Sequence, residues 1–396
     1  MSIADTLPQC ALHTHLSTEY CAVAFGEQTK VFNSKSGDCV FHHTNTSQKQ
    51  NAEENPNIGF IDLNGSSLVI AGNNKKVFLF DFLTQKLKAT YVHTRKVRIN
   101  VAINYNNFQL TGLFFTQDGK EVWLADKNGD AYSLDTSAIT GDDTFVYTSA
   151  TLRLGHISVI TDMLQTSDQK YVITSDRDEK IRVSQYPECY IIHTYLLGNK
   201  EAITSVKQID QDHIISSSLD RVLSIWSHKK EEDQLVCKYQ LEDTSLIPMK
   251  MSCAQNGSLH LIAVAIEQKP QIQIFSFDGT SIKPFQVLDL PAAAFDVKLT
   301  STFELWALTS QKESFVVYSL QENQFKPSSV HNSSVQTINA LISLGVDPNN
   351  KQMYKSSIYH KRVREEKEEE EDEDKPKLGK RARKTLAKKA NAAKVG

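Results

Sequence analysis

Two neighbouring stretches in the middle of the chain decide the fold: Gly155-His-Ile-Ser-Val-Ile-Thr-Asp162 and Tyr171-Val-Ile-Thr-Ser-Asp-Arg-Asp-Glu-Lys-Ile-Arg-Val183. The second contains two short β-prone runs with polar turn residues between them. Runs of this length, bounded by turn residues, predict antiparallel β-strands rather than helices. A third stretch, Ile214-Ile-Ser-Ser-Ser-Leu-Asp-Arg-Val-Leu-Ser-Ile-Trp226, has the same strand–turn–strand pattern. The pattern therefore indicates a repeat rather than a single hairpin.

The strand–turn–strand unit recurs along most of the chain. The position near the end of its second strand is occupied in turn by Phe32, Phe80, Leu134, Ser184, Trp226, Phe275 and Tyr318. Successive positions are 42 to 54 residues apart, which fits WD-type repeats with lengthened surface loops. Seven units predict an all-β fold: a seven-bladed WD-repeat β-propeller with four antiparallel strands in each blade.

The composition changes towards the end of the chain. We predict that the propeller spans residues 1–345 and that a C-terminal extension follows over residues 346–364. Residues 365–374 are nearly all acidic, whereas residues 375–396 carry nine Lys and Arg and no acid. Blocks of like charge repel themselves and bury nothing, so we predict a disordered acidic-then-basic tail over residues 365–396.

Two units carry the hydrogen-bonding residues of a WD repeat. In this repeat a turn aspartate accepts hydrogen bonds from turn amides and from the imidazole of a preceding Gly-His pair, because a packed blade would otherwise bury those groups unpaired. The residues that fit are His156 and Asp178 in the fourth unit and Asp220 in the fifth. The fifth unit has Asn199 where the histidine is expected, so we expect its network to be incomplete or altered.

The composition and motifs exclude several classes of protein. The chain has 396 residues, 40% hydrophobic and 23% charged, which is ordinary for a globular protein. No apolar run reaches the ~18 residues of a transmembrane helix and no signal-peptide pattern opens the chain, so we expect a soluble protein that is not secreted and binds no membrane. The six cysteines form no C-x-x-C pair, so we expect reduced thiols rather than zinc ligands or disulfides.

The motifs of common enzyme classes are missing from the sequence. There is no G-x-x-x-x-G-K-[ST], G-x-G-x-x-G, H-E-x-x-H or G-x-S-x-G. We therefore expect no catalytic residues, no cofactor-binding residues and no metal site in this chain.

Three segments are more specific than a generic WD repeat. They are residues 155–183 with the following Leu196-Leu-Gly-Asn-Lys-Glu201, the turn Leu124-Ala-Asp-Lys-Asn-Gly-Asp-Ala-Tyr132, and Met353-Tyr-Lys followed by Lys361-Arg-Val-Arg-Glu-Glu-Lys367. Together they resemble the wuho-like family, the non-catalytic WD-repeat subunits of tRNA (guanine-N7-)-methyltransferase. About 80 residues in the middle of the chain match well, and the blade pattern extends the resemblance loosely to Ser319.

The resemblance implies a division of labour between two subunits. A catalytic subunit binds S-adenosylmethionine and methylates N7 of a guanosine in the variable loop of tRNA. The propeller subunit holds that partner in a productive conformation, helps to seat the tRNA, and has neither enzymatic activity nor a cofactor of its own. The sequence agrees, because no acidic residue precedes a G-x-G loop and a Rossmann-type S-adenosylmethionine site has no candidate here.

The resemblance also implies which surface binds the catalytic subunit. It places Lys127 of the third-unit turn there, together with Asp178, Glu179, Lys180 and Arg182 of the fourth unit. A group of mixed charge can pair with a complementary helix on a partner and fix its register. An arginine can also bind a partner carboxylate through two hydrogen bonds, which a lysine cannot do.

Each of these residues also has a simpler interpretation. Asp178 fits the structural turn position of the repeat, and Arg182 fits a salt bridge between blades. Glu179, Lys180 and Lys127 fit solvated turn residues. The whole chain also fits a general WD-repeat scaffold, such as a chromatin or ubiquitin-ligase adaptor.

The basic tail predicts a cellular location and a contact with RNA. The cluster at its centre consists of Lys380, Arg381, Arg383 and Lys384. Such a cluster reads as a nuclear localisation signal, so we expect the protein in the nucleus. It also predicts contact with RNA phosphates, which weakens as salt rises; with no aromatic residue interleaved, base stacking is not available there. The alternative is a solvated end without a specific role.

Overall fold

The computed structural model describes ten segments of the chain: residues 14–16, 19–25, 28–44, 58–72, 76–92, 110–139, 144–309, 315–328, 335–336 and 339. The chain divides into two units, Met1–Met353 and Tyr354–Gly396, and all described residues belong to the first. The predicted extension (346–364) and the predicted tail (365–396), with Lys380, Arg381, Arg383 and Lys384, lie outside the described residues. Their boundaries stay predictions.

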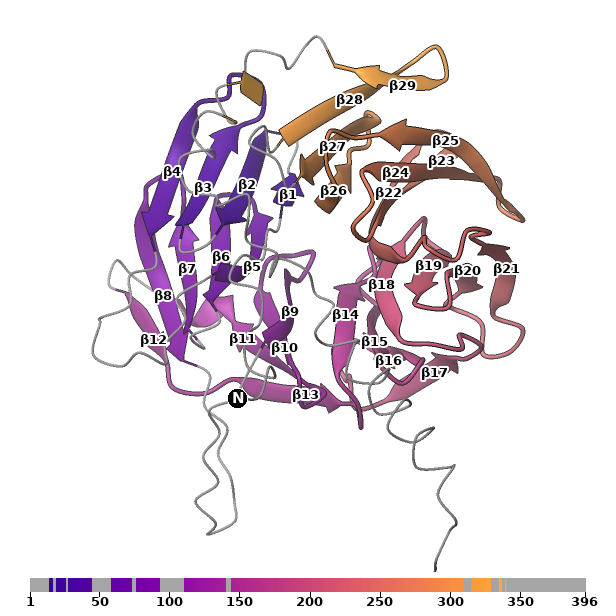
Figure 1. Ribbon diagram of the computed structural model, residues 1–396. Helices are drawn as coiled ribbons and strands as arrows, with labels where there is room; N and C mark the ends of the chain where they lie inside the picture. Colours follow the sequence, from indigo (N-terminus) through magenta and orange to yellow (C-terminus); the bar gives the residue numbers. More distant parts are fainter. Residues whose placement is uncertain are drawn as a thin grey trace, which may run out of the picture. The chain divides into compact units, whose positions relative to one another are not determined.

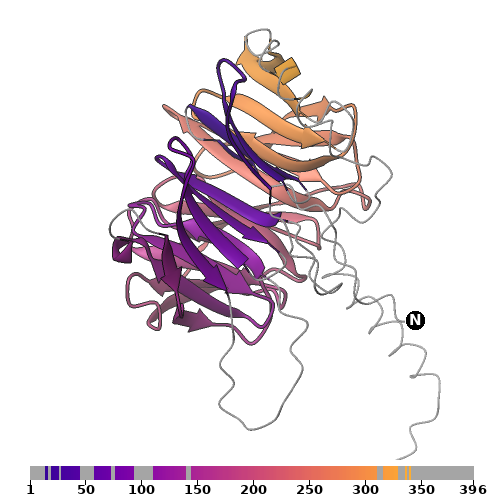
Figure 2. The ribbon, with the colours of Figure 1, turned by 90° about the vertical axis from the view of Figure 1, so that its left-hand side faces the viewer.

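Seven sheets follow one another along the chain and form a ring (Figures 1 and 2). From the first strand to the fourth, the blades are β1 (Thr14–Leu16), β2 (Tyr20–Phe25), β3 (Gln28–Asn33), β4 (Cys39–Thr44); β5 (Ile58–Asn64), β6 (Ser67–Gly72), β7 (Lys76–Asp81), β8 (Lys86–Val92); β9 (Leu110–Phe115), β10 (Glu121–Asp126), β11 (Asp130–Asp135), β13 (Thr151–Gly155); β14 (Ile160–Gln165), β15 (Tyr171–Asp176), β16 (Ile181–Gln185), β17 (Ile192–Leu196); β18 (Ile203–Gln208), β19 (His213–Ser218), β20 (Val222–Ser227), β21 (Leu235–Gln240); β22 (Pro248–Asn256), β23 (Leu259–Ile266), β24 (Gln271–Phe277), β25 (Ile282–Asp289); and β26 (Ala294–Leu299), β27 (Glu304–Thr309), β28 (Phe315–Gln321), β29 (Gln324–Pro327).

The prediction of an all-β, seven-bladed propeller is confirmed. All seven repeat positions identified in the sequence fall on the third strands of the blades: β3, β7, β11, β16, β20, β24 and β28. The four strands of each blade pair antiparallel in chain order. Among the described residues, no helix is long and apolar enough to cross a membrane.

Apolar side chains packed between blades form the core. The seam between blades four and five contains Ile173, Val183, Ile203, Ile214 and Trp226, and each is at most 1% exposed. Burying such a side chain contributes about 1.5–3 kcal/mol. The blades therefore stabilise one another through their faces, which explains why the repeat sequence alternates apolar and small residues.

Two further contacts tie the ring together. The strand β12 (Phe145–Tyr147), which follows the 3₁₀ helix η1 (Thr136–Ala138), leaves blade three and pairs in parallel with β8 of blade two. At the seam between blades seven and one, the Asn339 side chain accepts a hydrogen bond from the Phe315 amide at 2.8 Å and donates to the Phe315 carbonyl at 3.1 Å. Val335 packs on the same seam.

The alternating strand directions give the ring two different ends. We call the turn end the one that carries the turns between second and third strands and the connections between blades. The loop end carries the connections between first and second strands and between third and fourth strands.

Candidate partner interface at blades three and four

A buried hydrogen-bond network holds the turn of blade four. His156 lies in the connection between β13 and β14; its Nδ1 is 2.9 Å from Asp176 Oδ2 and its Nε2 is 2.7 Å from Thr174 Oγ1. An ionised carboxylate only accepts, so Nδ1 donates. Asp176 Oδ1 also accepts from the Lys180 amide at 3.0 Å. Burial by itself raises the pKa of Asp176, but the hydrogen bonds from His156 and Lys180 outweigh it and hold this pKa below its usual value.

The predicted pairing of His156 with Asp178 is therefore wrong. The partner is Asp176, the last residue of β15, whose side chain is 3% exposed, whereas the side chain of Asp178 in the turn is 45% exposed. Blade three shows the same arrangement. Asp126 ends β10 of blade three at the same position, and it accepts hydrogen bonds from the amides two and four residues further on, at 2.7 and 3.2 Å.

Blade five holds its turn with different residues. Asp220 accepts hydrogen bonds from the amides of Val222 at 2.9 Å and Lys200 at 3.0 Å, so it has the turn-amide part of its predicted role. Asn199 occupies the histidine position, and its Oδ1 lies 3.5 Å from Ser216 Oγ. Its Nδ2 is buried and has no hydrogen-bond partner among the described residues. The prediction of an altered network in the fifth unit is confirmed.

The connection 156–159 joins the turns of blades three and four. The His156 amide donates to the Gly129 carbonyl in the third-blade turn at 2.8 Å, and the Arg177 amide of the fourth-blade turn donates to the Val159 carbonyl at 3.0 Å. Gly129 has φ +90°, and a Cβ there would lie only 2.6 Å from the His156 carbonyl oxygen, so the close approach requires glycine. The two turns and the connection between them form one continuous surface at the turn end.

Four of the five residues assigned to the partner surface lie on this continuous surface. Lys127 is in the third-blade turn, whereas Asp178, Glu179 and Lys180 are in the fourth-blade turn, across the 156–159 connection. Lys180 is exposed and its Nζ donates to the Asp178 carbonyl at 3.3 Å; the other three are partly exposed. Both signs of charge thus stand on a backbone that the buried network holds in place.

Arg182 differs from these four residues because it is buried. It is 6% exposed; its Nε donates to Ser184 Oγ at 2.8 Å, its Nη1 to the Gly155 carbonyl at 3.1 Å and its Nη2 to the Cys189 carbonyl at 2.8 Å. Burial lowers the pKa of this arginine. Because Gly155 ends β13, Arg182 ties blade four to blade three through a backbone carbonyl rather than through a salt bridge. Its direct contact with a partner stays a prediction; in this chain it positions the start of the 156–159 connection.

One residue of this surface was missed in the sequence. Ile157 stands at the tip of the connection and is fully exposed. Its neighbours are fixed, because the His156 ring is bonded to blade four and Ser158 is buried. In the sequence, Ile157 looks like any isoleucine of a strand that faces the core, so nothing there indicated that its side chain is exposed.

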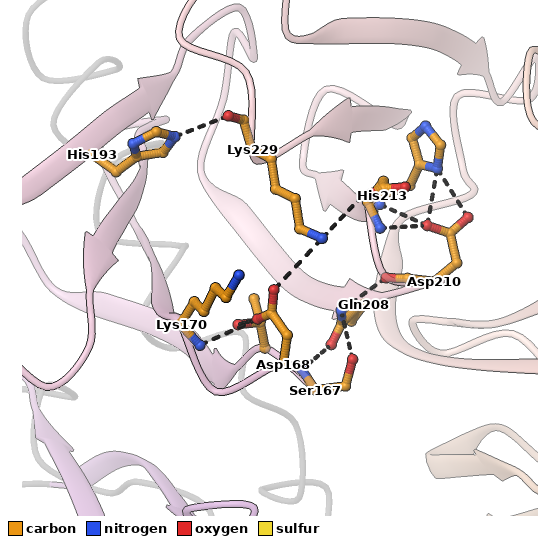
Figure 3. A network of polar contacts seen from close by, with 10 residues as sticks. Ser167, Asp168, Lys170, His193, Gln208, Asp210, His213 and Lys229 are labelled. Atoms are coloured by element: carbon orange, nitrogen blue, oxygen red, sulfur yellow. Dashed lines mark hydrogen bonds and ion pairs between the residues drawn. The ribbon is translucent and has the colours of Figure 1, made fainter.

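A second polar network lies at the loop end of blades four and five (Figure 3). Lys229 bridges Asp168 at 3.5 Å and Asp212 at 3.0 Å. Nearby, His213 Nδ1 lies 2.9 Å from Asp210 Oδ2. Hydrogen bonds from His213 and the neighbouring amides outweigh burial and lower the pKa of Asp210 to about 2. In the part of the chain that the structure describes, no group of three or more His, Cys, Asp and Glu side chains is arranged to hold a metal ion.

The seven-bladed ring and the His156–Asp176 network define a WD-repeat β-propeller. Among solved structures, the chain is similar to the β-propeller domain of Cps50 (Swd1) from Myceliophteria thermophila, with a TM-score of 0.62 over 80% of this chain and 97% of that one. The two are 12% identical, so this likeness shows the fold alone.

A family model described as the tRNA methyltransferase TRM82 WD40 domain matches residues 136–342, just over half of the chain. The chain belongs to this family, and the resemblance identified from the sequence is confirmed.

Two relatives are named as non-catalytic subunits of tRNA (guanine-N(7)-)-methyltransferase. The chain is 41% identical over 118 residues to wuho of Drosophila pseudoobscura pseudoobscura, covering 30% of this chain and 28% of the relative. It is 32% identical over 214 residues to wdr4 of Danio rerio, covering 51% of this chain and 50% of the relative. The chain thus matches half or less of the length of these relatives.

Proposed function

We propose that this chain is the non-catalytic subunit of a heterodimeric tRNA (guanine-N7-)-methyltransferase. The observation that carries the proposal is the family match over residues 136–342, which includes all of blade four and its connection to blade three. That region holds the fourth-blade turn on its buried network, and the relatives that match the chain are named as non-catalytic subunits of this enzyme.

In the proposed complex, the catalytic subunit binds S-adenosylmethionine and carries out methyl transfer, whereas this chain supplies a rigid docking surface. Lys127 and Lys180 attract carboxylates of the partner, and Asp178 and Glu179 attract its basic side chains. Complementary charges steer the encounter and fix the register of the two surfaces. A backbone already held in place loses little conformational entropy on binding, which favours affinity.

We also propose that the complex seats tRNA and acts in the nucleus. The proposal rests on the basic residues Lys380, Arg381, Arg383 and Lys384 of the tail. Deleting residues 375–396 should lessen nuclear accumulation of a fluorescent fusion and spare the heterodimer. An unchanged nuclear signal would remove the import role of this cluster.

Reconstitution tests the central proposal. This chain, the catalytic subunit and their mixture are each incubated with S-adenosylmethionine and tRNA, and N7-methylguanosine is measured. We expect the mixture to form much more N7-methylguanosine than either subunit forms alone. No complex and no stimulation would leave a general WD-repeat scaffold as the better interpretation.

Charge reversal then tests the surface. The double variant Glu179→Lys with Lys180→Glu should abolish co-elution with the catalytic subunit and leave the melting temperature near that of the wild type. The matched control is Arg221→Glu, which changes a charge at the equivalent turn position of blade five, where φ is +67° against +73° at Glu179. Loss of binding in the control as well would show that the effect is not specific to blade four.

A further inference from the structure

The outer edge of blade four carries an exposed apolar segment. Residues 190–197 read Tyr-Ile-Ile-His-Thr-Tyr-Leu-Leu and contain no charged residue. Five of these eight side chains are large, apolar or aromatic, and exposed: Tyr190, Ile191, Ile192, Tyr195 and Leu197. The centre of the segment is β17, the last strand of its sheet, which pairs with β16 on one side and has no strand on its other side among the described residues (Figure 1).

The other outer strands are protected in ways common in natural sheets. β13 and β21 carry Arg153 and Lys238, while β25 and β29 each contain a lysine and a proline. β8 is covered by β12. β4 exposes Cys39, His42 and Thr44 rather than large apolar side chains. Among the seven outer strands that the structure describes, β17 alone exposes large apolar side chains without a charge, a proline or a covering strand.

β17 is held rigidly from the side of blade five. The His193 ring lies 3.1 Å from the Lys229 carbonyl, and the Thr194 hydroxyl accepts a hydrogen bond of 2.9 Å from a glutamine side chain of blade five. Ile192 and Tyr195 are left exposed on this fixed strand. The β16–β17 ladder has one register shift, between Val183 and Ser184. An ordered edge with exposed apolar side chains is a template for another strand.

We propose that β17 receives an extended segment of the catalytic subunit as an added strand, an inference that rests on the proposed function. Main-chain hydrogen bonds supply affinity in this mode, and alternate side chains of the added strand pack on Ile192 and Tyr195. The chain itself adds a strand to a blade edge in the same manner, where β12 pairs with β8.

The position of β17 identifies the occupant. Tyr195 pairs with Arg182 across the β16–β17 ladder, and Arg182 donates to the Gly155 carbonyl, where the 156–159 connection begins. β17 ends at Leu196, and the exposed Leu197 follows it in the connection to blade five, so the apolar edge reaches the turn end that carries the proposed docking surface. A partner seated on the charged turns reaches the edge with a short extended segment.

Hydrogen exchange of the full-length wild-type chain, free and bound to the purified catalytic subunit, tests the inference directly. Strand addition should slow exchange of amides in Ile192–Leu196 at least tenfold and leave Leu235–Gln240 of β21 unchanged. Unchanged exchange in β17 within a complex that does form overturns the added strand alone. Failure of the wild-type chain to bind the catalytic subunit overturns the proposed function and this occupant with it.

Lysine substitutions provide a second test. Ile192→Lys with Tyr195→Lys should weaken binding of the catalytic subunit at least tenfold in titration calorimetry. The matched control, Leu235→Lys with Val287→Lys, alters exposed residues of the outer strands of blades five and six and should change the dissociation constant less than twofold. Equal affinity of the edge variant and the wild type overturns the inference. The inference is also overturned if light scattering shows that the wild-type chain is a dimer and the edge variant a monomer, because the occupant of the edge is then a second copy of this chain.

Discussion

Blades four and five are consecutive copies of one repeat, yet each keeps a different half of the repeat's hydrogen-bond network. Blade four has the histidine and the aspartate, His156 and Asp176, but has Ser184 where a tryptophan would follow. Blade five has that tryptophan, Trp226, whose Nε1 donates to a buried serine hydroxyl at 2.9 Å, but has Asn199 at the histidine position.

The difference shows what each half contributes. The histidine and aspartate fix the turn at the end of the strands, whereas the tryptophan fills the seam with the neighbouring blade. In blade four the small Ser184 takes the tryptophan position, and its hydroxyl accepts the hydrogen bond of Arg182 Nε, so the guanidinium occupies that space and reaches blade three. The blade with the fixed turn is the one that carries the proposed docking surface.

The largest expected effect comes from breaking the histidine–aspartate half of blade four. Asp176→Ala leaves the buried His156 ring and the Lys180 amide without their acceptor, so we expect a loss of about 3 kcal/mol in the free energy of unfolding. Asp178→Ala, in the exposed turn, should change it by about 0.5 kcal/mol or less. Urea denaturation of both variants measures the difference, and a costlier Asp178→Ala would reverse the assignment of the two aspartates.

A somewhat smaller effect on the free energy of unfolding is expected from a buried histidine of blade five, and it depends on pH. His228 follows β20 of blade five and is fully buried, with no hydrogen-bond partner for either ring nitrogen among the described residues. Burial, and then the charge of Lys229, lower the pKa of His228 to about 4. The unfolded chain takes up a proton at this residue below its usual pKa of about 6.5, so the folded state loses stability as the pH falls from about 6.5 to 4.

The variant His228→Phe removes this proton uptake. Between pH 7 and pH 4.5 the wild type should lose about 2 kcal/mol more stability than the variant, a value scaled from the pKa difference. The lowered pKa of Asp176 acts in a different window, because its stabilisation is present above the usual carboxyl pKa and is lost only as the pH falls through the lower folded value. Urea midpoints between pH 7 and pH 4.5 measure the His228 window, and midpoints below the usual aspartate pKa of about 3.9 measure the Asp176 window. Parallel curves for the two proteins between pH 7 and pH 4.5 would contradict the buried neutral imidazole.

Much of this comparison was predictable from the sequence, because the repeat is local. The two strands and the turn of each unit lie within about 15 residues, so alternation and turn chemistry identify them. The choice between Asp176 and Asp178 was not predictable from the sequence, because both residues lie near the turn. It depends on where the ladder between β15 and β16 ends, and the pair Ser175–Ile181 is its last rung.

Features that depend on neighbouring blades were also beyond the sequence pattern. Strand alternation places Arg182 on the face opposite Ile181. It does not show that the carbonyls of Gly155 and Cys189 accept hydrogen bonds from the guanidinium there. The strand β12 joins an edge in another blade, so its pairing follows from tertiary proximity rather than from its three residues.

Removing the tryptophan of blade five should lower the free energy of unfolding less than removing the aspartate that holds the turn of blade four. Trp226→Phe removes the indole donor to Ser216 and leaves a small gap in the seam, so we expect a loss of about 1–2 kcal/mol. Binding of the catalytic subunit should stay within twofold of the wild type, because the seam lies away from the 156–159 connection. A binding defect larger than that of Asp176→Ala would show that blade five, rather than blade four, orders the docking surface.

The smallest effect is a gain, obtained by giving blade five the half that it lacks. Asn199→His with Ser218→Asp places the blade-four pair at the equivalent positions of blade five and removes the buried, unpartnered Nδ2 of Asn199. We expect the double variant to be more stable by about 1 kcal/mol, with each single variant neutral or destabilised, because the imidazole and the carboxylate satisfy each other. A double-mutant cycle in urea isolates this coupling. Zero coupling would mean that the backbone of the blade-five turn, held by Asp220 through the amides of Lys200 and Val222, keeps the two side chains apart. The histidine–aspartate half would then be specific to the geometry of blade four, where the connection from blade three sets the position of the imidazole.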